Sequence, residues 1–257
     1  MPAEPAVLRW TGRALEPVDE AVAGPVLAAD SWLVDDGLVL ALDAHRARFL
    51  GAVGGRADAA PFWAAAVATL PREGAWFPRV ELLRLSDGSE ELRLQLRPAP
   101  ARGRELVVAT HWGPDPRSQP TVKGPDLEAL GAARARTAER GADEAVLLSP
   151  DGELVEGAWS ALAWWHSERM HVVDPALPRI RSVTEHELLA VAAEEGVGID
   201  FVRATPTELD GAELWVLSAL HGPRRATAWL DGPRLTGRPG RLDHWRGRLL
   251  ARRQPLA

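Results

Sequence analysis

The sequence predicts a mixed fold of the α/β (α+β) class, divided by a linker into two parts. Residues 79–86 and 90–97 alternate apolar and polar side chains around an Asp-Gly pair at 87–88, which is a strong signal for a β-hairpin. Helix-like stretches stand between strand-like stretches along the rest of the 257 residues, enough chain for one large domain or two modest ones. Residues 98–104, with two prolines and a glycine, are the best candidate linker.

The first part is expected to hold one more hairpin and two helices. Residues 31–42 predict a hairpin that turns at the Asp-Gly pair 36–37. Asp43 and Asp58 each precede a helical pattern, so we expect each carboxylate to cap the helix that follows it. The second of these helices is rich in alanine and is expected to run from about 59 to 70.

The second part is expected to be richer in strands. A strand at 105–110 leads into a loop dense in Pro and Gly, and then into a helix capped by Asp126 and ended by Gly141. Thr184 and Glu187 have capping-box spacing and predict the start of a further helix that ends at Gly196. Four short strands are expected to form a meander: 144–149, 153–157, 160–165 and 170–173. Two more strands and a basic amphipathic helix are expected near 199–203, 213–218 and 241–253.

Composition excludes several classes of protein. The chain has no cysteine, which excludes disulfides, thiolate metal sites and cysteine nucleophiles, and fits a cytoplasmic location. A net charge of −6 argues against general nucleic-acid binding, and no apolar run approaches the roughly 20 residues of a membrane span. His45, His111 and His221 match no metal-ligand spacing, so no metal site is expected.

Lysine usage is the most informative bias. Lys and Arg together number 30, and Lys123 is the one lysine among them. A lone lysine can survive compositional drift by chance. It can also persist because a primary amine with an adjustable pKa is needed, which a guanidinium cannot supply. Composition alone leaves both interpretations open.

Other residues carry weaker signals, each with an ordinary structural alternative. Glu156 shares a strand face with an apolar neighbour, so it is expected to point inward and to need a cationic partner. Thr184 at a helix start and Ser218 at a strand end are places where hydroxyl and amide groups could bind phosphate. Arg48 could bind the same phosphate as a cation. Taken singly, these are more often a surface charge or an ordinary cap.

The order of these residues resembles a known family. The runs TVKGPDLEAL, DGELVEGAWSALAWW, SVTEHELLAVAAEEG and AELWVLSALHG are similar to those of the class IV aminotransferases. These fold-type IV enzymes use pyridoxal 5′-phosphate (PLP), and they comprise branched-chain and D-amino acid aminotransferases and aminodeoxychorismate lyase. LALDAHRARFL resembles their H-x-x-R helix. The resemblance covers roughly residues 30–230 and is most specific over 121–222.

The resemblance implies a fold, a cofactor and a set of site residues. It implies a small α/β domain at 1–103, a larger β-rich pseudo-barrel domain at 104–257, and assembly as a homodimer. It implies that Lys123 forms a Schiff base with PLP and moves the substrate proton, and that Glu156 pairs with the pyridine nitrogen. The remaining cofactor-binding residues that it implies, for the phosphate, are Arg48, Val183, Thr184, Ser218 and Ala219.

The resemblance leaves three functions open. An aminotransferase acting on a small amino acid is favoured as the broader assignment. A lyase that releases pyruvate from aminodeoxychorismate is the alternative, suggested by Ser31 and by the Ser-Ala-Leu loop. A non-catalytic PLP-binding protein is the third. Relatives often carry a tyrosine near the cofactor and a glycine at the position of Ser182, and this chain has neither. Arginines of the second hairpin are candidates for binding a substrate carboxylate: Arg84, Arg93 and Arg97.

Overall fold

The computed structural model describes residues 5–18 and 24–256 and divides the chain into two compact units. The first unit contains the chain up to residue 102 together with 122–127 and the residues from 252 onward. The second unit contains 103–121 and 128–251. The short segment 122–127, which carries Lys123, therefore belongs with the first unit although its neighbours on both sides belong to the second.

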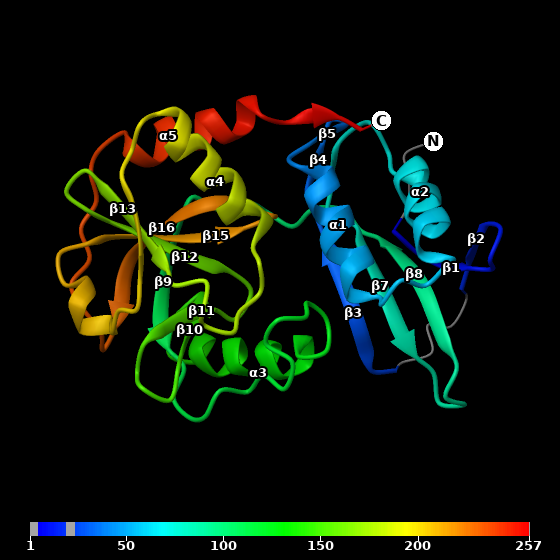
Figure 1. The fold of residues 1–257 in the computed structure, drawn as a ribbon, viewed down its shortest axis with the longest axis horizontal. Helices are drawn as coiled ribbons and strands as arrows, with labels where there is room; N and C mark the ends of the chain where they lie inside the picture. The colour runs from blue at the N-terminus through cyan, green and yellow to red at the C-terminus, as the bar shows by residue number, and fades with distance from the viewer. Residues whose placement is uncertain (1–4, 19–23, 257) are drawn as a thin grey trace. The chain divides into compact units, whose positions relative to one another are not determined.

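A five-stranded antiparallel sheet forms the base of the first unit (Figure 1). Its order is β2-β1-β8-β7-β3, and the predicted hairpin at 79–97 is confirmed as β7 and β8. Alternate residues of these strands point to one face, where α1 and α2 pack and where Phe49, Phe62 and Trp63 meet. The elements are β1 Ala6–Trp10, β2 Leu15–Pro17, β3 Val26–Ser31, β7 Arg79–Arg84, β8 Glu90–Leu96, α1 Leu42–Ala52 and α2 Ala59–Thr69.

A small second sheet in this unit has the order β17-β5-β4-β6. Its strands are β4 Val34–Asp35, β5 Leu38–Val39, β6 Ala75–Trp76 and β17 Gln254–Pro255. The predicted turn at 36–37 is confirmed, since Asp36 and Gly37 both have positive φ, the conformation that a two-residue hairpin turn requires. The hairpin is shorter than expected because residues up to Ser31 belong to β3.

An eight-stranded mixed sheet forms the second unit, in the order β11-β10-β9-β16-β15-β12-β13-β14 (Figure 1). The expected meander is wrong in its pairing. β10 and β12 each form a hairpin with the next strand, as a meander requires, but the second neighbour of β10 is β9 and the second neighbour of β12 is β15. The strands are β9 Glu105–Thr110, β10 Glu144–Leu148, β11 Leu154–Gly157, β12 Ala161–His166, β13 Arg169–Val173, β14 Ile199–Val202, β15 Glu213–Ser218 and β16 Gly222–Leu230.

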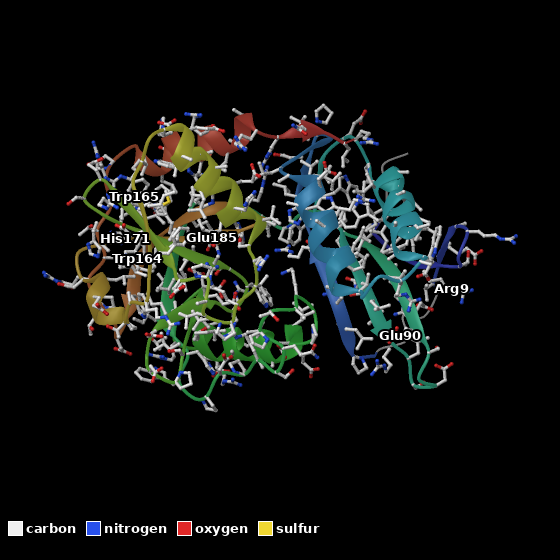
Figure 2. All side chains as sticks on the ribbon, viewed as in Figure 1. Arg9, Glu90, Trp164, Trp165, His171 and Glu185 are labelled. Carbon is white, nitrogen blue, oxygen red and sulfur yellow. The ribbon has the colours of Figure 1, made fainter. Side chains whose placement is uncertain are left out.

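Three helices and one short turn of 3₁₀ helix complete the second unit. They are α3 Leu127–Ala138, which begins at the last residue of the 122–127 segment, α4 Val183–Glu194, η1 Pro206–Leu209 and α5 Arg241–Ala251. The basic helix α5 is anchored by Trp245, whose ring packs edge-on against Trp165 with centroids 5.2 Å apart. Trp164 of the same strand stacks on His171, at 5.9 Å and an interplanar angle of 15° (Figure 2).

Three of the predicted helix caps differ from the structure, two in the capping residue and one in the capping contact. Ala41 rather than Asp43 is the N-cap of α1, and Asp43 lies in the first turn, where its charge still favours the helix dipole. Ser182 caps α4 through a hydroxyl that accepts a hydrogen bond from the Glu185 amide at 3.2 Å, so Thr184 lies inside the helix. Asp58 does occupy the N-cap of α2, but its carboxylate binds Arg56 instead of the helix.

Candidate functional site

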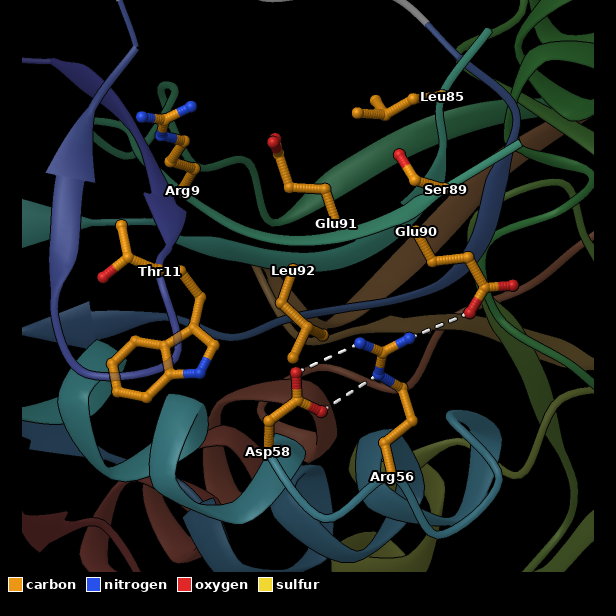
Figure 3. A pocket seen from close by; sticks show the side chains of 10 residues that line it. Arg9, Thr11, Arg56, Asp58, Leu85, Ser89, Glu90, Glu91 and Leu92 are labelled. Atoms are coloured by element: carbon orange, nitrogen blue, oxygen red, sulfur yellow. Dashed lines mark hydrogen bonds and ion pairs between the residues drawn. The ribbon is translucent and has the colours of Figure 1, made fainter. Parts of the chain in front are cut away.

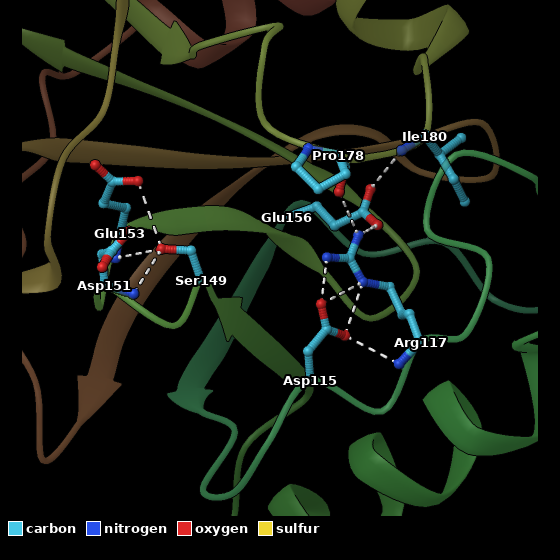
Figure 4. A network of polar contacts seen from close by, with 8 residues as sticks. All are labelled: Asp115, Arg117, Ser149, Asp151, Glu153, Glu156, Pro178 and Ile180. Carbon is cyan, nitrogen blue, oxygen red and sulfur yellow. Dashed lines mark hydrogen bonds and ion pairs between the residues drawn. The ribbon is translucent and has the colours of Figure 1, made fainter.

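Glu156 lies at the end of strand β11 with its carboxylate almost fully buried. The residue is 4% exposed, and both of its oxygens have partners (Figure 4). Oε1 accepts a hydrogen bond from Nη1 of Arg117 at 2.6 Å, and Oε2 accepts one from the Ile180 amide at 3.2 Å. The inward direction predicted for this side chain is confirmed, and the carboxylate is fixed from two sides.

Arg117 is the cationic partner that the sequence analysis missed. Its side chain is only 2% exposed, and it also binds the Asp115 carboxylate at 2.6 Å and donates to the Pro178 carbonyl at 3.1 Å (Figure 4). Three acceptor groups, one from each of three separate segments, therefore meet around one guanidinium. The sequence signal was weak, because Arg117 is 39 residues from Glu156 and is one of many arginines in the chain.

Burial raises the pKa of the Glu156 carboxyl to about 7, and Arg117 opposes that rise. Burial disfavours the charged form, whereas the nearby guanidinium and the Ile180 amide favour it. A carboxyl poised near neutrality can exchange a proton with a bound basic group at little cost. Perturbed carboxyls of this kind cluster at functional sites, although structural ion pairs also produce them.

Helix α4 begins three residues after Ile180, whose amide binds Glu156, and its first turn presents a group of backbone amides. Val183 and Thr184 form the first turn, both buried, with Ser182 as the cap. The first amides of a helix lack partners within the helix, and the helix dipole there favours negative charge. A phosphate group could be bound at such a position. Ser182 supplies the cap through its hydroxyl, which accepts from the Glu185 amide.

Ser218 ends strand β15, and the chain turns back there into β16. Its hydroxyl oxygen accepts a hydrogen bond from the His221 amide at 3.3 Å, and Ser218 pairs in register with Gly222. The ring of His221 in turn accepts from the Gly103 amide at 3.2 Å. Ser218 and Ala219 therefore stand in a short, internally braced loop, and the Ser218 hydroxyl can still donate its own proton to a ligand.

In the first unit, a buried carboxylate binds two basic side chains of helix α1, His45 and Arg48. Asp30 of β3 is 0% exposed. It accepts hydrogen bonds from Nε and Nη2 of Arg48 at 2.7 and 2.8 Å, and its Oδ1 lies 2.8 Å from Nδ1 of His45. Burial would raise the pKa of Asp30, but His45 and Arg48 together hold it well below its usual value. The predicted phosphate ligand Arg48 is thus oriented by a carboxylate that the sequence analysis did not identify.

Lys123 lies against the same strand. Its carbonyl oxygen accepts a hydrogen bond from the Ala29 amide of β3 at 2.7 Å. Burial lowers the pKa of His45, Asp30 opposes this, and the positive charges of Arg48 and Lys123 lower it further. Lys123 and Arg48 are therefore close enough to His45 to act on its charge. The structure brings together the lysine, the predicted arginine and the strand that carries Asp30.

The candidates for binding substrate lie at two ends of the first unit's sheet. Ser31, 7% exposed, is paired with Arg79 at the start of β7, and Arg84 ends that strand five residues later, roughly 17 Å away. Arg84 binds Glu90 at 3.0 Å in solvent. Arg97 follows β8 near the Ser31 end, with Nε donating to the Phe77 carbonyl at 3.2 Å. The structure thus separates Arg84 from Ser31 and Arg97.

A cavity of about 350 Å³ opens elsewhere in the first unit (Figure 3). Charged residues that line the cavity pair with one another, since Arg56 binds both Asp58 and Glu90 at about 3 Å. None of the predicted site residues lines it. Among the described residues, His, Asp and Glu side chains form no group of three that could hold a metal ion. Nor does any described helix have the length and apolarity to cross a membrane.

Comparison with known proteins gives a family match and a fold match. The family model described as amino-transferase class IV matches residues 27–229. A search of curated proteins finds no match. A branched-chain aminotransferase from the thermophilic archaeon Thermoproteus uzoniensis, with norvaline, is a similar solved structure, with a TM-score of 0.80 and 16% identity over 98% of this chain and 100% of that one.

Two further solved structures have the same fold. A fold IV-transaminase from Curtobacterium pusillum has a TM-score of 0.77 and 19% identity, over 96% of this chain and 98% of its own. A hypothetical aminotransferase from Mycobacterium tuberculosis, in its PLP-bound form, gives the same four values. At these identities the likeness shows the fold, and the predicted fold class is confirmed.

Proposed function

Because the chain belongs to the class IV aminotransferase family, we propose that it binds PLP and transfers amino groups between a small amino acid and a keto acid. Two residues carry the proposal, Lys123 in the first unit and Glu156 in the second, and each is argued within its own unit. The main chain of Lys123, whose side chain carries the one side-chain primary amine of the sequence, is hydrogen-bonded to strand β3. The buried Glu156 carboxyl, whose pKa burial raises to about 7, binds Arg117. PLP-bound structures among those similar to this chain support the choice of cofactor.

The residues present fit the chemical groups of that cofactor. Lys123 would supply the amine for covalent attachment, and Glu156 would bind the ring nitrogen through a carboxylate that is already desolvated. We assign the phosphate to Arg48, to the first-turn amides of Val183 and Thr184, and to the loop at Ser218 and Ala219. These assignments match the charge and donor type of each group: cations and amides for the phosphate, and an anion for a protonated nitrogen.

When bound, PLP supplies an electron sink for the carbanion that forms at the substrate's α-carbon. The chain's part is to place and move protons. Lys123 would remove the proton from the α-carbon and return it at a different atom, acting as general base and then as general acid. Glu156 would keep a proton on the ring nitrogen, and Arg117 would favour the anionic form of Glu156 and fix its direction.

The test is incubation of purified protein with PLP and a panel of amino acids, while the cofactor absorbance is followed. We expect one or more donors to convert the cofactor to its amine form, and a keto acid to restore it. Lys123→Arg keeps the charge but should lose both covalent PLP and turnover, because a guanidinium does not form the Schiff base. Normal turnover by this variant would refute the mechanism.

Aminodeoxychorismate lyase is the second candidate. Its support is the place of Ser31, which is buried in β3 two residues after Ala29, the residue that binds the Lys123 backbone. Pyruvate released from aminodeoxychorismate without added keto acid would favour the lyase, whereas amino transfer to a keto acid favours the aminotransferase. A protein that binds PLP but is inert in both assays would be a non-catalytic PLP-binding protein. Assembly as a homodimer and a cytoplasmic location belong to the same proposal.

A further inference from the structure

The main chain at Lys123 is bound to the outer edge of strand β3. This strand is the last of its sheet, and its other edge pairs with β7. The Ala29 amide, which points outward from the sheet, donates to the Lys123 carbonyl at 2.7 Å. The acceptor of this edge-strand amide thus lies in a segment nearly a hundred residues later in the chain. The contact lies within the first unit.

The residue after Lys123 can be only a glycine if this contact is to form. A Cβ built on Gly124 would lie 2.7 Å from the carbonyl carbon of Ala28 and 2.8 Å from both its Cα and the Ala29 nitrogen. All three are backbone atoms of β3, so no side-chain rotation could relieve the overlap. The φ of Gly124 is also +138°, in a region that residues with a side chain rarely adopt. Two independent features therefore require glycine at this position.

We propose that Gly124 is a positioning residue for Lys123: its missing side chain lets the lysine backbone dock on β3, and this docking fixes where the amine stands. The proposal rests on the proposed function of Lys123. The same strand carries Asp30, which binds His45 and Arg48. One strand thus binds the main chain of Lys123 and, through Asp30, the side chains of His45 and Arg48.

The test compares Gly124→Ala with wild type and with Gly51→Ala. Gly51 lies in helix α1, and a Cβ added there meets no atom within 4 Å, so this variant is a matched glycine-to-alanine control. Covalent PLP is measured by borohydride reduction and the mass of the intact chain, and total PLP affinity by quenching of tryptophan fluorescence. We expect Gly124→Ala to lose covalent attachment at least about tenfold while total affinity falls much less, and Gly51→Ala to match wild type in both. A merely structural defect would lower both quantities together.

If the Gly124→Ala variant folds and borohydride fixes PLP onto its Lys123 as readily as in wild type, the proposal is overturned. If that variant does not fold, hydrogen exchange at the Ala29 amide of wild type decides, because the proposal requires this amide to be protected as strongly as amides paired between β3 and β7. Exchange at the rate of an open edge amide would overturn it. Wild type that takes no PLP onto Lys123 while Ala29 stays protected would instead refute the proposed function.

Discussion

At the scale of single residues, Glu156 is the group on which most of the proposed chemistry depends. Glu156→Gln keeps the shape and the Ile180 contact but removes the charge that would hold a proton on the ring nitrogen. We expect the variant to bind PLP and to turn over on the order of a hundredfold more slowly, a loss in the range that removing one electrostatic contact to the reacting system costs. Glu153→Gln, on the same hairpin and paired with Ser149, is the control and should keep its rate. Equal rates for wild type and Glu156→Gln would reduce Glu156 to a structural role.

The raised pKa of the Glu156 carboxyl predicts how the free energy of unfolding depends on pH in the absence of PLP. Its pKa is about 7 in the folded chain and 4.5 in the reference state, so between these values the folded chain binds the additional proton. Its contribution to the free energy of unfolding is therefore complete below pH 4.5 and is lost as pH rises through 7. Urea unfolding of wild type and Glu156→Gln from about pH 4.5 to about pH 8 should show wild type losing stability relative to the variant. A difference that is constant across this range would contradict the assignment.

Asp30 should matter for stability more than an exposed carboxylate. It is fully buried and bound to both His45 and Arg48, so Asp30→Asn leaves the largely buried Arg48 guanidinium without its counter-charge. Breaking such a pair costs about 3–5 kcal/mol, whereas an exposed pair is worth at most about 1 kcal/mol. Asp58→Asn, which removes a half-exposed partner of Arg56, is the matched control. Equal losses from the two variants in urea unfolding would show that the Asp30 network is not a buried ion-pair network.

At the scale of elements, the cap of α4 separates two interpretations of the same sequence. The capping-box spacing predicted Thr184 as the cap, whereas the structure has Ser182, whose hydroxyl accepts from the Glu185 amide. Ser182→Ala should therefore destabilise the chain by about 1 kcal/mol, the usual cost of losing a cap. Thr184→Ala should leave the cap intact. Chemical denaturation of both variants measures the difference, and a larger loss from Thr184→Ala would restore the original prediction.

Local patterns were enough to predict the elements that local chemistry decides. The Asp-Gly pairs at 36–37 and 87–88 predicted both hairpins, because such turns depend on residues with positive φ at the turn itself. The pairing of β10 with β9 and of β17 with β5 could not be predicted in this way. Those partners are far apart in the sequence, and strand alternation specifies a face of the sheet but does not specify a neighbour.

At the scale of the whole molecule, the same limit applies to the candidate site. The lone lysine and the inward-pointing Glu156 could be found from composition and from strand parity. Arg117 and Asp30 could not, because each acts through a partner brought close only by the fold, and nothing in their neighbourhoods marks them among the other charged residues. Lys123 and Asp30 belong to the first unit, and Glu156 and Arg117 to the second.

The central claim is that PLP attaches to Lys123, and reduction with borohydride tests it most directly. The chain offers two kinds of primary amine, the α-amino group and a single lysine side chain. After incubation with PLP, reduction and proteolysis, the account predicts one phosphopyridoxyl group per chain, carried by the peptide that contains Lys123. A label found on the α-amino group alone, or no label under conditions where the protein is folded, would contradict it.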